Sequence, residues 1–475
     1  MTAAGPDGHG TPRVAVVATA RPTFAVDVAR QRAAAARALI AELGGDVRGP
    51  AGLVMSEQDI DAAAGAAGSG ADLIVNVCAT FSDASPALRL YRDLTAPLLL
   101  WAFREPGPAG DRLWLNSLCG ANLFGHAVVR SGGSVRLLHG DPDEHRVRRI
   151  LRSALAGELP AAVPSRDPGR PRAGRETARR ALRSLRGAVI GLVGDAPDGF
   201  TPSDYDPRLL DSMFGVTVRA LSTGEMFRRV RATGPAQRQA ELAAARQAQP
   251  SLDTVEPEQA ELAAATTAAM RDWVNRASLA AVAVRCWPEF PARLGVCPCS
   301  SLSRLADAGT PTACERDVYG ALTMLLLEAL GSGPTYLVDT VDLDSEANVI
   351  RAWHCGSAAT RLAADPARAT QSVHCNRGIG VAGDFPLRTG PVVMARLAED
   401  PRRGLRLLIA SGESLPEPNR FQGNTAAIRL GADAEEFVHG LVTGGFPHHT
   451  VLAWTDVRPP LRAAADLLGI GVCEW

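Results

Sequence analysis

Apolar strands and helical segments alternate along the first third of the chain. Strand-like runs of apolar and β-branched residues stand at Arg13–Val17, Leu73–Val77, Pro97–Phe103 and Val135–Leu138. Helical segments lie between them, and the first, rich in Ala and Arg, extends to about Leu43. Because strands that alternate with helices usually form parallel sheets, residues 13–158 predict a doubly wound α/β domain. Ligands of such sheets bind at the C-terminal ends of the strands. For residues 1–12 we expect a disordered N-terminus.

The same alternation returns after a break. Residues 159–186 are dense in Pro, Arg and Gly and have little apolar periodicity, so we interpret them as a linker with room for a helix near its end. A second α/β domain is predicted over residues 187–341. Its expected strands are Ala188–Val193, Val216–Leu221 and Leu279–Val284. A long helix rich in Ala, Glu, Arg and Gln is expected across Gln237–Gln247.

From about Asp342 the pattern changes to short β segments separated by Gly, Pro and Asn. The expected strands include Val349–His354, Pro391–Leu397, Leu405–Ala410 and Ala426–Leu430. Residues 342–475 therefore predict an antiparallel sheet or small barrel. The fold class expected for the whole chain is α/β, with two doubly wound parallel-sheet domains followed by this β-rich C-terminal domain.

Composition narrows the class of protein. Hydrophobic residues make up 46% of the 475 residues, charged residues 21%, and the net charge is -1, so nothing in the charge favours nucleic acid as a partner. The first residues lack a signal-peptide pattern, and no apolar run reaches the roughly 18 residues of a membrane span. We expect a cytoplasmic protein without a membrane partner. The nine cysteines are scattered in apolar contexts, which favours reduced core residues over disulfides.

Every one of the 50 basic residues is Arg. Without Lys the chain has no Schiff-base nucleophile, no pyridoxal-phosphate anchor and no P-loop lysine. A glycine-rich dinucleotide fingerprint is also absent from both α/β segments. Chemistry on a carbonyl group would therefore use a metal ion as the electron sink.

Two carboxylates and two imidazoles in the C-terminal third are candidates for such a metal site. They are Glu315, Asp339, His354 and His449. This mixture suits a borderline-hard divalent ion such as Mn²⁺, Co²⁺ or Zn²⁺ better than a thiolate-bound structural zinc. Four protein ligands on an octahedral ion would leave two positions for neighbouring oxygens of a sugar.

Each of these residues also has a structural alternative. Glu315 completes a Thr312-x-x-Glu capping box before the apolar helix Ala321–Leu330, and a carboxylate folded back on the backbone is less available to a metal. Asp339 follows the strand-like Thr335–Val338, where a turn residue is the alternative. His354 alone could be a hydrogen-bonded core residue.

The pair His448-His449 precedes a strand that begins near Val451. Adjacent residues of an extended chain point to opposite faces, so we expect only one of the two to reach a given ion. We choose His449, and His448 is left to orient it, to bind substrate or to face solvent.

Several segments resemble the L-fucose/L-arabinose isomerase-like family. They are Ala313-Cys314-Glu315-Arg316-Asp317 leading into Gly320-Ala321-Leu322-Thr323, Asp339, Trp353-His354-Cys355-Gly356, Gly444-Gly445-Phe446-Pro447-His448-His449-Thr450 and Cys286-Trp287-Pro288-Glu289. The resemblance implies that Glu315, Asp339 and His449 bind Mn²⁺ or another divalent cation such as Co²⁺, Mg²⁺ or Zn²⁺. His354 matches a fourth ligand of the arabinose-type branch. It also implies a homo-oligomer, a trimer or hexamer, with the site near a subunit interface.

The activity implied is the interconversion of an aldose and a ketose through a cis-enediol. Glu315 and Asp339 would then serve as the acid/base pair as well as metal ligands. Further candidates for contact with the substrate are His448, Trp287, Arg285 and Asn424. The class of sugar stays open among deoxyhexoses, pentoses and sulfonated hexoses.

Two segments depart from the family pattern. Relatives often continue after the paired histidines with Gly-Asp, whereas this chain has Ala453-Trp454-Thr455-Asp456, and His374-Cys375-Asn376-Arg377 matches no family segment. A surface loop is one interpretation of the latter, and a second polar cluster near the substrate is another. Cys297-Pro298-Cys299 offers two cysteines without a matching pair, a weak zinc signal.

Three other functions remain open from the sequence. A metal-dependent aldolase or epimerase would use the same ion and enediolate but give a cleaved or inverted product. A non-catalytic sugar-binding protein could place a sugar between two α/β lobes. A degenerate isomerase-like protein could serve another role in a specialised pathway.

Overall fold

The computed structural model describes residues 11–67, 70–92, 96–171, 173–400 and 404–475. The expected disorder of the N-terminus falls almost entirely outside them. The chain divides into two compact units. The first holds Met1–Pro106, Trp114–Val163 and His439–Phe446, and the second holds Gly107–Leu113, Pro164–Val438 and Pro447–Trp475. No helix of the described part is both long and apolar enough to cross a membrane.

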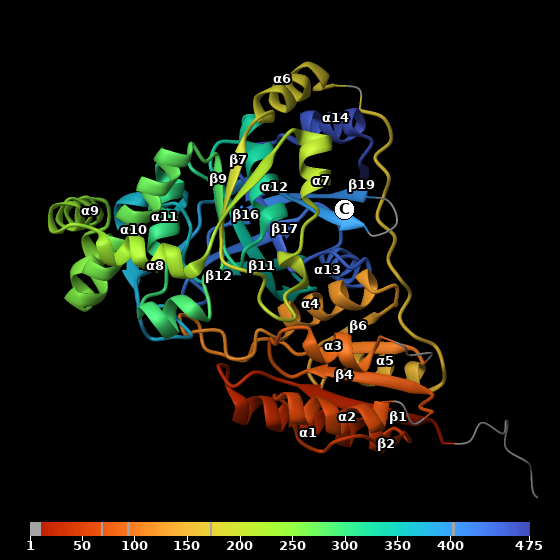
Figure 1. Cartoon of the computed structure of the whole chain (residues 1–475). Coiled ribbons are helices and arrows are strands. Elements are labelled where there is room, and N and C mark those ends of the chain that lie inside the picture. The colour runs from red at the N-terminus through yellow and green to blue at the C-terminus, as the bar shows by residue number, and fades with distance from the viewer. Residues whose placement is uncertain (1–10, 68–69, 93–95, 172, 401–403) are drawn as a thin grey trace, which may run out of the picture. The chain divides into compact units, whose positions relative to one another are not determined.

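The first unit is a parallel α/β sheet, drawn from red to orange in Figure 1. Its strands run in the order β2-β1-β4-β5-β6, with β3 added beside β1, and every pairing is parallel. The strands are β1 Arg13–Thr19, β2 Asp46–Arg48, β3 Leu53–Val54, β4 Leu73–Cys78, β5 Leu98–Ala102 and β6 Arg136–His139. The helices are α1 Val26–Glu42, α2 Glu57–Ala67, α3 Ser85–Leu90, α4 Ser117–Arg130 and α5 His145–Leu155.

Helical and strand periodicity explain this packing. Helix α1 buries a stripe of residues three or four apart, Ala29, Ala33, Ala36 and Ile40, against the strands. Strand β4 is buried along its whole length, as expected for an inner strand of a parallel sheet covered on both faces. The predicted first α/β domain is thereby confirmed in class and in its four main strands.

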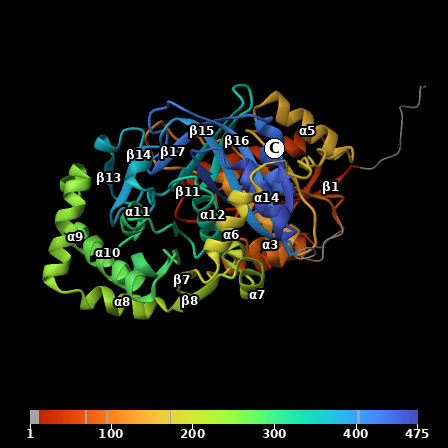
Figure 2. The same ribbon diagram turned by 90° about the horizontal axis from the view of Figure 1, so that it is seen from above.

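The second unit begins with another parallel sheet, of order β10-β9-β7-β8. Its strands are β7 Val189–Val193, β8 Thr217–Leu221, β9 Ala281–Val284 and β10 Thr312–Ala313. The helices of this segment are α6 Arg175–Leu185, α7 Pro207–Leu209, α8 Thr223–Ala232, α9 Pro235–Ala248, α10 Pro257–Ala277, α11 Cys299–Asp307 and α12 Val318–Ala329. Helices α8, α9 and α11 pack against α10, and Figures 1 and 2 draw this group of helices in green. The helix expected near the end of the linker is α6.

The C-terminal segment is a mostly antiparallel sheet that closes on itself. Strands β17-β12-β11-β18-β15-β16 pair antiparallel in that order, and β16 pairs with β17 again, so six strands form a small barrel. The strands are β11 Thr335–Asp344, β12 Val349–His354, β13 Thr370–Ser372, β14 Ala382–Pro386, β15 Gly390–Asp400, β16 Gly404–Leu415, β17 Asn424–Leu430, β18 His449–Ala453 and β19 Gly471–Glu474. Helices α13 Ala434–Thr443 and α14 Arg458–Leu468 complete it.

Strand β11 belongs to the barrel and not to the second parallel sheet. The predicted boundary at residue 342 therefore falls inside β11, and Asp339 lies on the barrel, whereas Glu315 follows β10 of the parallel sheet. The apolar run Thr335–Val338 resembles a parallel-sheet strand because both of its faces are buried. Its partners, however, are the antiparallel strands β12 and β18.

Helix α12 connects these two sheets. Nearly all of its residues are buried, and one apolar core joins it to β7 and β9 on one side and to β15, β16 and β18 on the other. A helix covered on several sides is apolar all round, which explains the sequence Leu322–Leu327. The loop before α12 is thereby fixed beside the ends of the barrel strands.

Candidate metal centre

Glu315 lies in the short loop between β10 and α12. It and Arg316 both have left-handed backbone conformations, with φ of 56° and 62°, which are uncommon for residues other than glycine. The loop is held by the hydroxyl of Ser203, which donates to the carbonyl of Glu315 at 2.6 Å, and by Arg316, which donates to the carbonyls of Gly194 and Ser203. Such strained residues are often found at functional sites.

The helix cap expected at Thr312 is wrong. Helix α12 begins at Val318, and its N-cap is Asp317, whose Oδ1 accepts the backbone N–H of Gly320 at 2.7 Å. Thr312 lies in β10 instead. Glu315 therefore stands two residues before the cap, and its carboxylate is not needed for capping.

The register of the barrel sets Asp339 beside His449. The two residues are directly opposite on the antiparallel strands β11 and β18. Their side chains are 6% and 1% exposed, and Nε2 of His449 lies 3.6 Å from Oδ1 of Asp339 and 3.5 Å from Oε2 of Glu315. Nε2 makes no hydrogen bond to any residue that the structure describes. Nε2 of His449 thus lies between the two carboxylates, and His449 belongs to two groups whose ligand atoms all lie within 4.8 Å of one another: one with Glu315 and His448, the other with Asp339 and His354.

The other nitrogen of His449 is held from behind. Nδ1 lies 2.9 Å from Oδ2 of Asp317, and Asp317 in turn forms a fully buried ion pair with Arg396 of β15, with Nη2 at 2.8 Å from Oδ1. A carboxylate behind a histidine fixes its tautomer and orientation, the arrangement usual for metal-binding histidines. With Nδ1 protonated toward Asp317, the lone pair of Nε2 would face the carboxylates.

His448 also reaches Glu315. Its Nε2 lies 3.1 Å from Oε2 of Glu315, and the ring centroids of His448 and His449 are 4.1 Å apart. The expectation that the pair points to opposite faces is wrong, because β18 starts only at His449 and His448 belongs to the turn before it. The indole of Trp287 donates to Oε1 of Glu315 at 3.2 Å. Both residues therefore orient the Glu315 carboxylate.

The charges of the site reinforce one another. Burial would raise the pKa of Glu315, but the hydrogen bond with His448 and the neighbouring imidazoles outweigh burial and lower that pKa to about 2. Burial would lower the pKa of His449, but the hydrogen bond to Asp317 and the charges of Glu315 and Asp339 raise it. A cation at the centre of the site is thus favoured, whether a proton on His449 or a metal ion.

His354 lies beside this centre in a neutral form. Burial, and after it the charge of His449, lowers its pKa to about 3. One of its ring nitrogens lies within 4.8 Å of the ligand atoms of Asp339 and His449. Nδ1 accepts the backbone N–H of Cys355 at 2.9 Å. The hydrogen of the neutral ring is therefore on Nε2.

Two of the predicted substrate contacts have their polar groups engaged within the protein. Arg285 forms an ion pair with Glu289 at 2.7 Å and donates to the carbonyl of Asp195. Asn424 is fully buried, and its Oδ1 accepts hydrogen bonds from the hydroxyl of Tyr336 and the backbone N–H of Ala358. These bonds give both residues a structural role in the described fold.

The donor set can be tested against the chemistry of metal ions. Glu315, Asp339 and His449 present two carboxylate oxygens and one imidazole nitrogen, the ligands of Mn²⁺ and related ions. The imidazole nitrogen that faces the carboxylates makes no hydrogen bond among the described residues. The residues present therefore fit a divalent cation, and the buried groups do not specify which one.

Asp317 and Arg396 were missed by the sequence analysis. Asp317 lies two residues after Glu315, and its position before the apolar helix could have marked it as the cap. Arg396 stands within the apolar strand β15, where a fully buried arginine needs a carboxylate partner. A single charged residue in an apolar strand therefore indicated a buried ion pair, although it does not identify the carboxylate partner.

The fold and the site together define a protein in which carboxylates and imidazoles that could hold a metal ion gather between a parallel sheet and a small barrel. No family model matches the chain. A sulfoquinovose isomerase from Alkalicoccus urumqiensis is 32% identical to it over 428 residues, which cover 90% of this chain and 91% of that relative. A sulfoquinovose isomerase from Priestia aryabhattai is 30% identical over 405 residues, 85% of each chain.

The chain belongs to the family of these sugar isomerases, the sulfoquinovose isomerases. The resemblance inferred from the sequence is confirmed for an isomerase that interconverts an aldose and a ketose, although these relatives are not named for L-fucose or L-arabinose. A solved galactofuranose binding protein covers 66% of this chain at 10% identity, with a TM-score of 0.18, too low to indicate a shared fold.

Proposed function

We propose that this protein is a metal-dependent isomerase that converts a sulfonated aldohexose of the sulfoquinovose type into its ketose. One observation carries the metal site: Nε2 of His449 lies about equally far from the carboxylates of Glu315 and Asp339, at 3.5 and 3.6 Å. Glu315, Asp339 and His449 would hold the ion, which we propose to be Mn²⁺.

When bound, such an ion would supply a Lewis acid that polarises the sugar carbonyl and stabilises an enediolate. The chain itself supplies the proton carriers. One carboxylate of the pair Glu315 and Asp339 takes the proton from C2 of the open-chain sugar and returns it at C1, while the other moves the hydroxyl proton from O2 to O1. The side chains of Glu315 and Asp339 are only 15% and 8% exposed, so both carriers are largely shielded from bulk water between the two transfers.

Two neighbouring groups position these carriers. His448 and Trp287 both donate to the Glu315 carboxylate, which fixes the direction of its lone pairs. His354 was predicted as a fourth metal ligand. A ring nitrogen of His354 lies within 4.8 Å of the ligand atoms of Asp339 and His449, so we keep His354 as the proposed fourth ligand. Binding through Nε2 would move the ring hydrogen to Nδ1 at the loss of the hydrogen bond from the backbone N–H of Cys355.

The choice of a sulfonated sugar is supported by the named relatives, which cover most of the chain. A sulfonate is a tetrahedral anion whose oxygens can accept two parallel hydrogen bonds from a guanidinium group. The chain has no lysine, so arginine would supply the cation. Arg285 is not proposed as the anchor, since its ion pair with Glu289 already occupies it.

A substrate panel tests this function. Purified protein with added Mn²⁺ would be incubated with sulfoquinovose, D-glucose, L-fucose and L-arabinose, and the products identified by ¹³C NMR. We expect a ketose from sulfoquinovose at a kcat/KM at least 100-fold above that for D-glucose. Cleavage products would instead identify an aldolase, and an inverted aldose an epimerase. No conversion of any sugar would contradict the proposal.

The expected homo-oligomer stays a prediction. Light scattering coupled to size exclusion gives the mass of the particle in solution, and a trimer or hexamer of the 49.8 kDa chain is expected. A monomer that is fully active would contradict the expectation that a subunit interface contributes to the site.

A further inference from the structure

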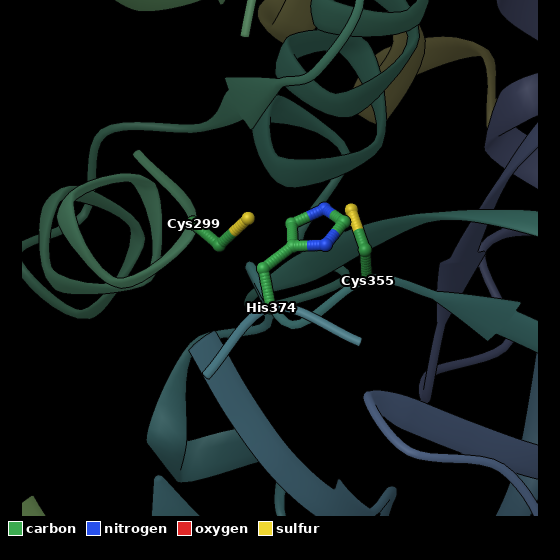
Figure 3. Close-up of side chains that lie close together, drawn as sticks. All are labelled: Cys299, Cys355 and His374. Carbon is green, nitrogen blue, oxygen red and sulfur yellow. The ribbon is translucent and has the colours of Figure 1, made fainter. Parts of the chain in front are cut away.

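A second group of metal-ligand side chains lies outside the carboxylate centre. The sulfur atoms of Cys299 and Cys355 and a ring nitrogen of His374 all lie within 4.8 Å of one another. Figure 3 shows the imidazole of His374 between the two sulfur atoms. None of the three belongs to the proposed ligands of the isomerase site.

Three distant segments bring these side chains together. Cys299 is the first residue of α11, Cys355 follows the last residue of β12, and His374 lies in the loop between β13 and β14. The sequence offered Cys297-Pro298-Cys299 and His374-Cys375 as unconnected signals. The fold joins one residue of each and adds Cys355 as a third.

The chemistry of this group differs from that of the first centre. It contains two thiols, one imidazole and no carboxylate. Thiolate and imidazole ligands in nearly tetrahedral sites are typical of Zn²⁺, whereas Mn²⁺ and Mg²⁺ prefer oxygen. Cys299 is 1% exposed, and the apolar neighbours Cys297, Ile379 and Ala382 pack around the group. A bound ion there would be shielded from solvent.

Ordinary buried cysteines provide the alternative explanation, because free cysteine packs well as a small apolar side chain. In that case a thiol usually faces aliphatic neighbours. Here Sγ of Cys355 lies within 4.8 Å of Sγ of Cys299 and of a ring nitrogen of His374, and it lies 3.3 Å from Nδ1 of His354. Sulfur therefore faces sulfur and nitrogen, which packing alone does not require.

The imidazole of His374 indicates which nitrogen would bind. Nδ1 accepts the backbone N–H of Asn376 at 3.1 Å, which leaves Nε2 for an ion. In the neutral ring without an ion the hydrogen then sits on Nε2, and metal binding would move it to Nδ1 at the loss of the bond from Asn376. The loss of one hydrogen bond is small beside the affinity of a thiolate–imidazole site for zinc.

We propose that Cys299, Cys355 and His374 bind Zn²⁺ in a structural site separate from the isomerase centre. The fourth position of the ion is filled by water. The zinc ties the loop of His374 to the start of α11 and to the end of β12. Because Cys355 follows His354 directly, the same ion fixes the backbone that positions the His354 ring.

The test uses the full-length protein loaded with Zn²⁺ or Co²⁺ and then dialysed. Elemental analysis should give one zinc per chain in addition to any ion of the isomerase centre. Cobalt at this site should give a near-ultraviolet absorption band from thiolate-to-metal charge transfer. Cys299→Ser should lose the zinc and the band, and His374→Gln, as a second variant, should weaken zinc binding at least 10-fold.

Matched controls separate this site from the isomerase centre. Cys297→Ser replaces an equally buried cysteine two residues earlier and should keep both the zinc and the band. Glu315→Gln should also keep both, whether or not it abolishes isomerase activity, so failure of the proposed function and failure of this site are distinguishable. The proposal would be overturned if the wild type lacked the thiolate band or if the band persisted in Cys299→Ser. A Cys299–Cys355 disulfide without bound metal would also overturn it.

Discussion

Nδ1 of His449 lies 2.9 Å from Oδ2 of Asp317, and Asp317 is the residue that caps helix α12. One buried carboxylate therefore starts the central helix of the second unit, neutralises Arg396 and orients the histidine of the metal centre. Since the helix and the barrel strand are both fixed by this group, the position of His449 depends on the packing of the whole unit.

Asp317→Asn tests this relationship. The amide can still cap α12, because asparagine is a good N-cap residue, but it cannot serve His449 as a charged acceptor. We expect the affinity for Mn²⁺, measured by calorimetry, to fall about 10- to 100-fold. Both Asn and Ala remove the charge that neutralises Arg396; Ala also removes the oxygens that accept its hydrogen bonds and would destabilise the fold by about 3–5 kcal/mol. An unchanged metal affinity in Asp317→Asn would show that the carboxylate serves the fold alone.

Glu315→Gln tests the proton carrier with almost no change of shape. The side chain keeps its size and can still meet Trp287 and His448, but it is a weak ligand and no base. We expect kcat for the sugar to fall by about 10²- to 10⁴-fold, with circular dichroism unchanged. Glu346→Gln, an exposed residue of the β11–β12 turn, is the matched control and should retain full activity. Comparable rates for the two variants would remove Glu315 from the mechanism.

Replacement of Gly356 by Ala tests how tightly the chain turns after His354 and Cys355. Its φ is +114°, and a Cβ atom there would meet the carbonyl oxygen of Gly383 at 2.5 Å. Gly390 has a similar φ of +111°, but a Cβ atom would meet nothing within 4 Å. Both alanine variants therefore carry backbone strain of about 1–3 kcal/mol, and only Gly356→Ala adds a clash. Thermal unfolding should show a clearly lower Tm for Gly356→Ala, whereas equal Tm values would mean that the backbone near Gly383 yields.

His139 of the first unit predicts how stability depends on pH. It is 1% exposed, and burial, followed by the charge of Arg104, lowers its pKa from 6.5 to about 3. The unfolded chain binds a proton below pH 6.5 and the folded chain does not, so its contribution to stability is present above that pH and is lost as the pH falls toward 3. Between pH 7 and pH 5 the free energy of unfolding falls by about 2 kcal/mol because of this one histidine.

His139→Gln should flatten this dependence in urea unfolding at pH 7, 6 and 5. His145→Gln, an exposed histidine at the start of α5, controls for the removal of an imidazole. A wild type and a His139→Gln variant with parallel pH profiles would show that His139 is protonated in the folded protein as well.

Local patterns were sufficient for most of the helices and strands, and they named the residues that the fold gathers at the candidate metal site. The strand Leu73–Val77 and the C-terminal barrel follow from periodicity and turn residues, and Glu315 and His449 were found from their chemical type and sequence context. The capping box at Thr312 was wrong because Asp317 competes for the same helix end. A local pattern cannot decide between two caps that lie close together.

Long-range pairing was the part that the sequence could not provide. The partner of Arg396 is 79 residues away, and the placement of Asp339 on the barrel depends on strands on both sides of it. The convergence of Cys299 with His374 likewise depends on how α11 and the β13–β14 loop pack. These relations come from the tertiary fold, where each contact joins segments that have no common local signal.

Titration of metal-free protein with Mn²⁺ tests the central claim most directly. Chelator-treated protein would receive increasing Mn²⁺, and the rate of ketose formation from sulfoquinovose would be followed together with the bound metal. The account predicts almost no ketose formation without added metal. The rate should then rise linearly with Mn²⁺ until one ion is bound per chain at the Glu315 site. The Glu315→Gln variant should show no such rise. Full activity without metal, or an equal response of Glu315→Gln, would contradict it.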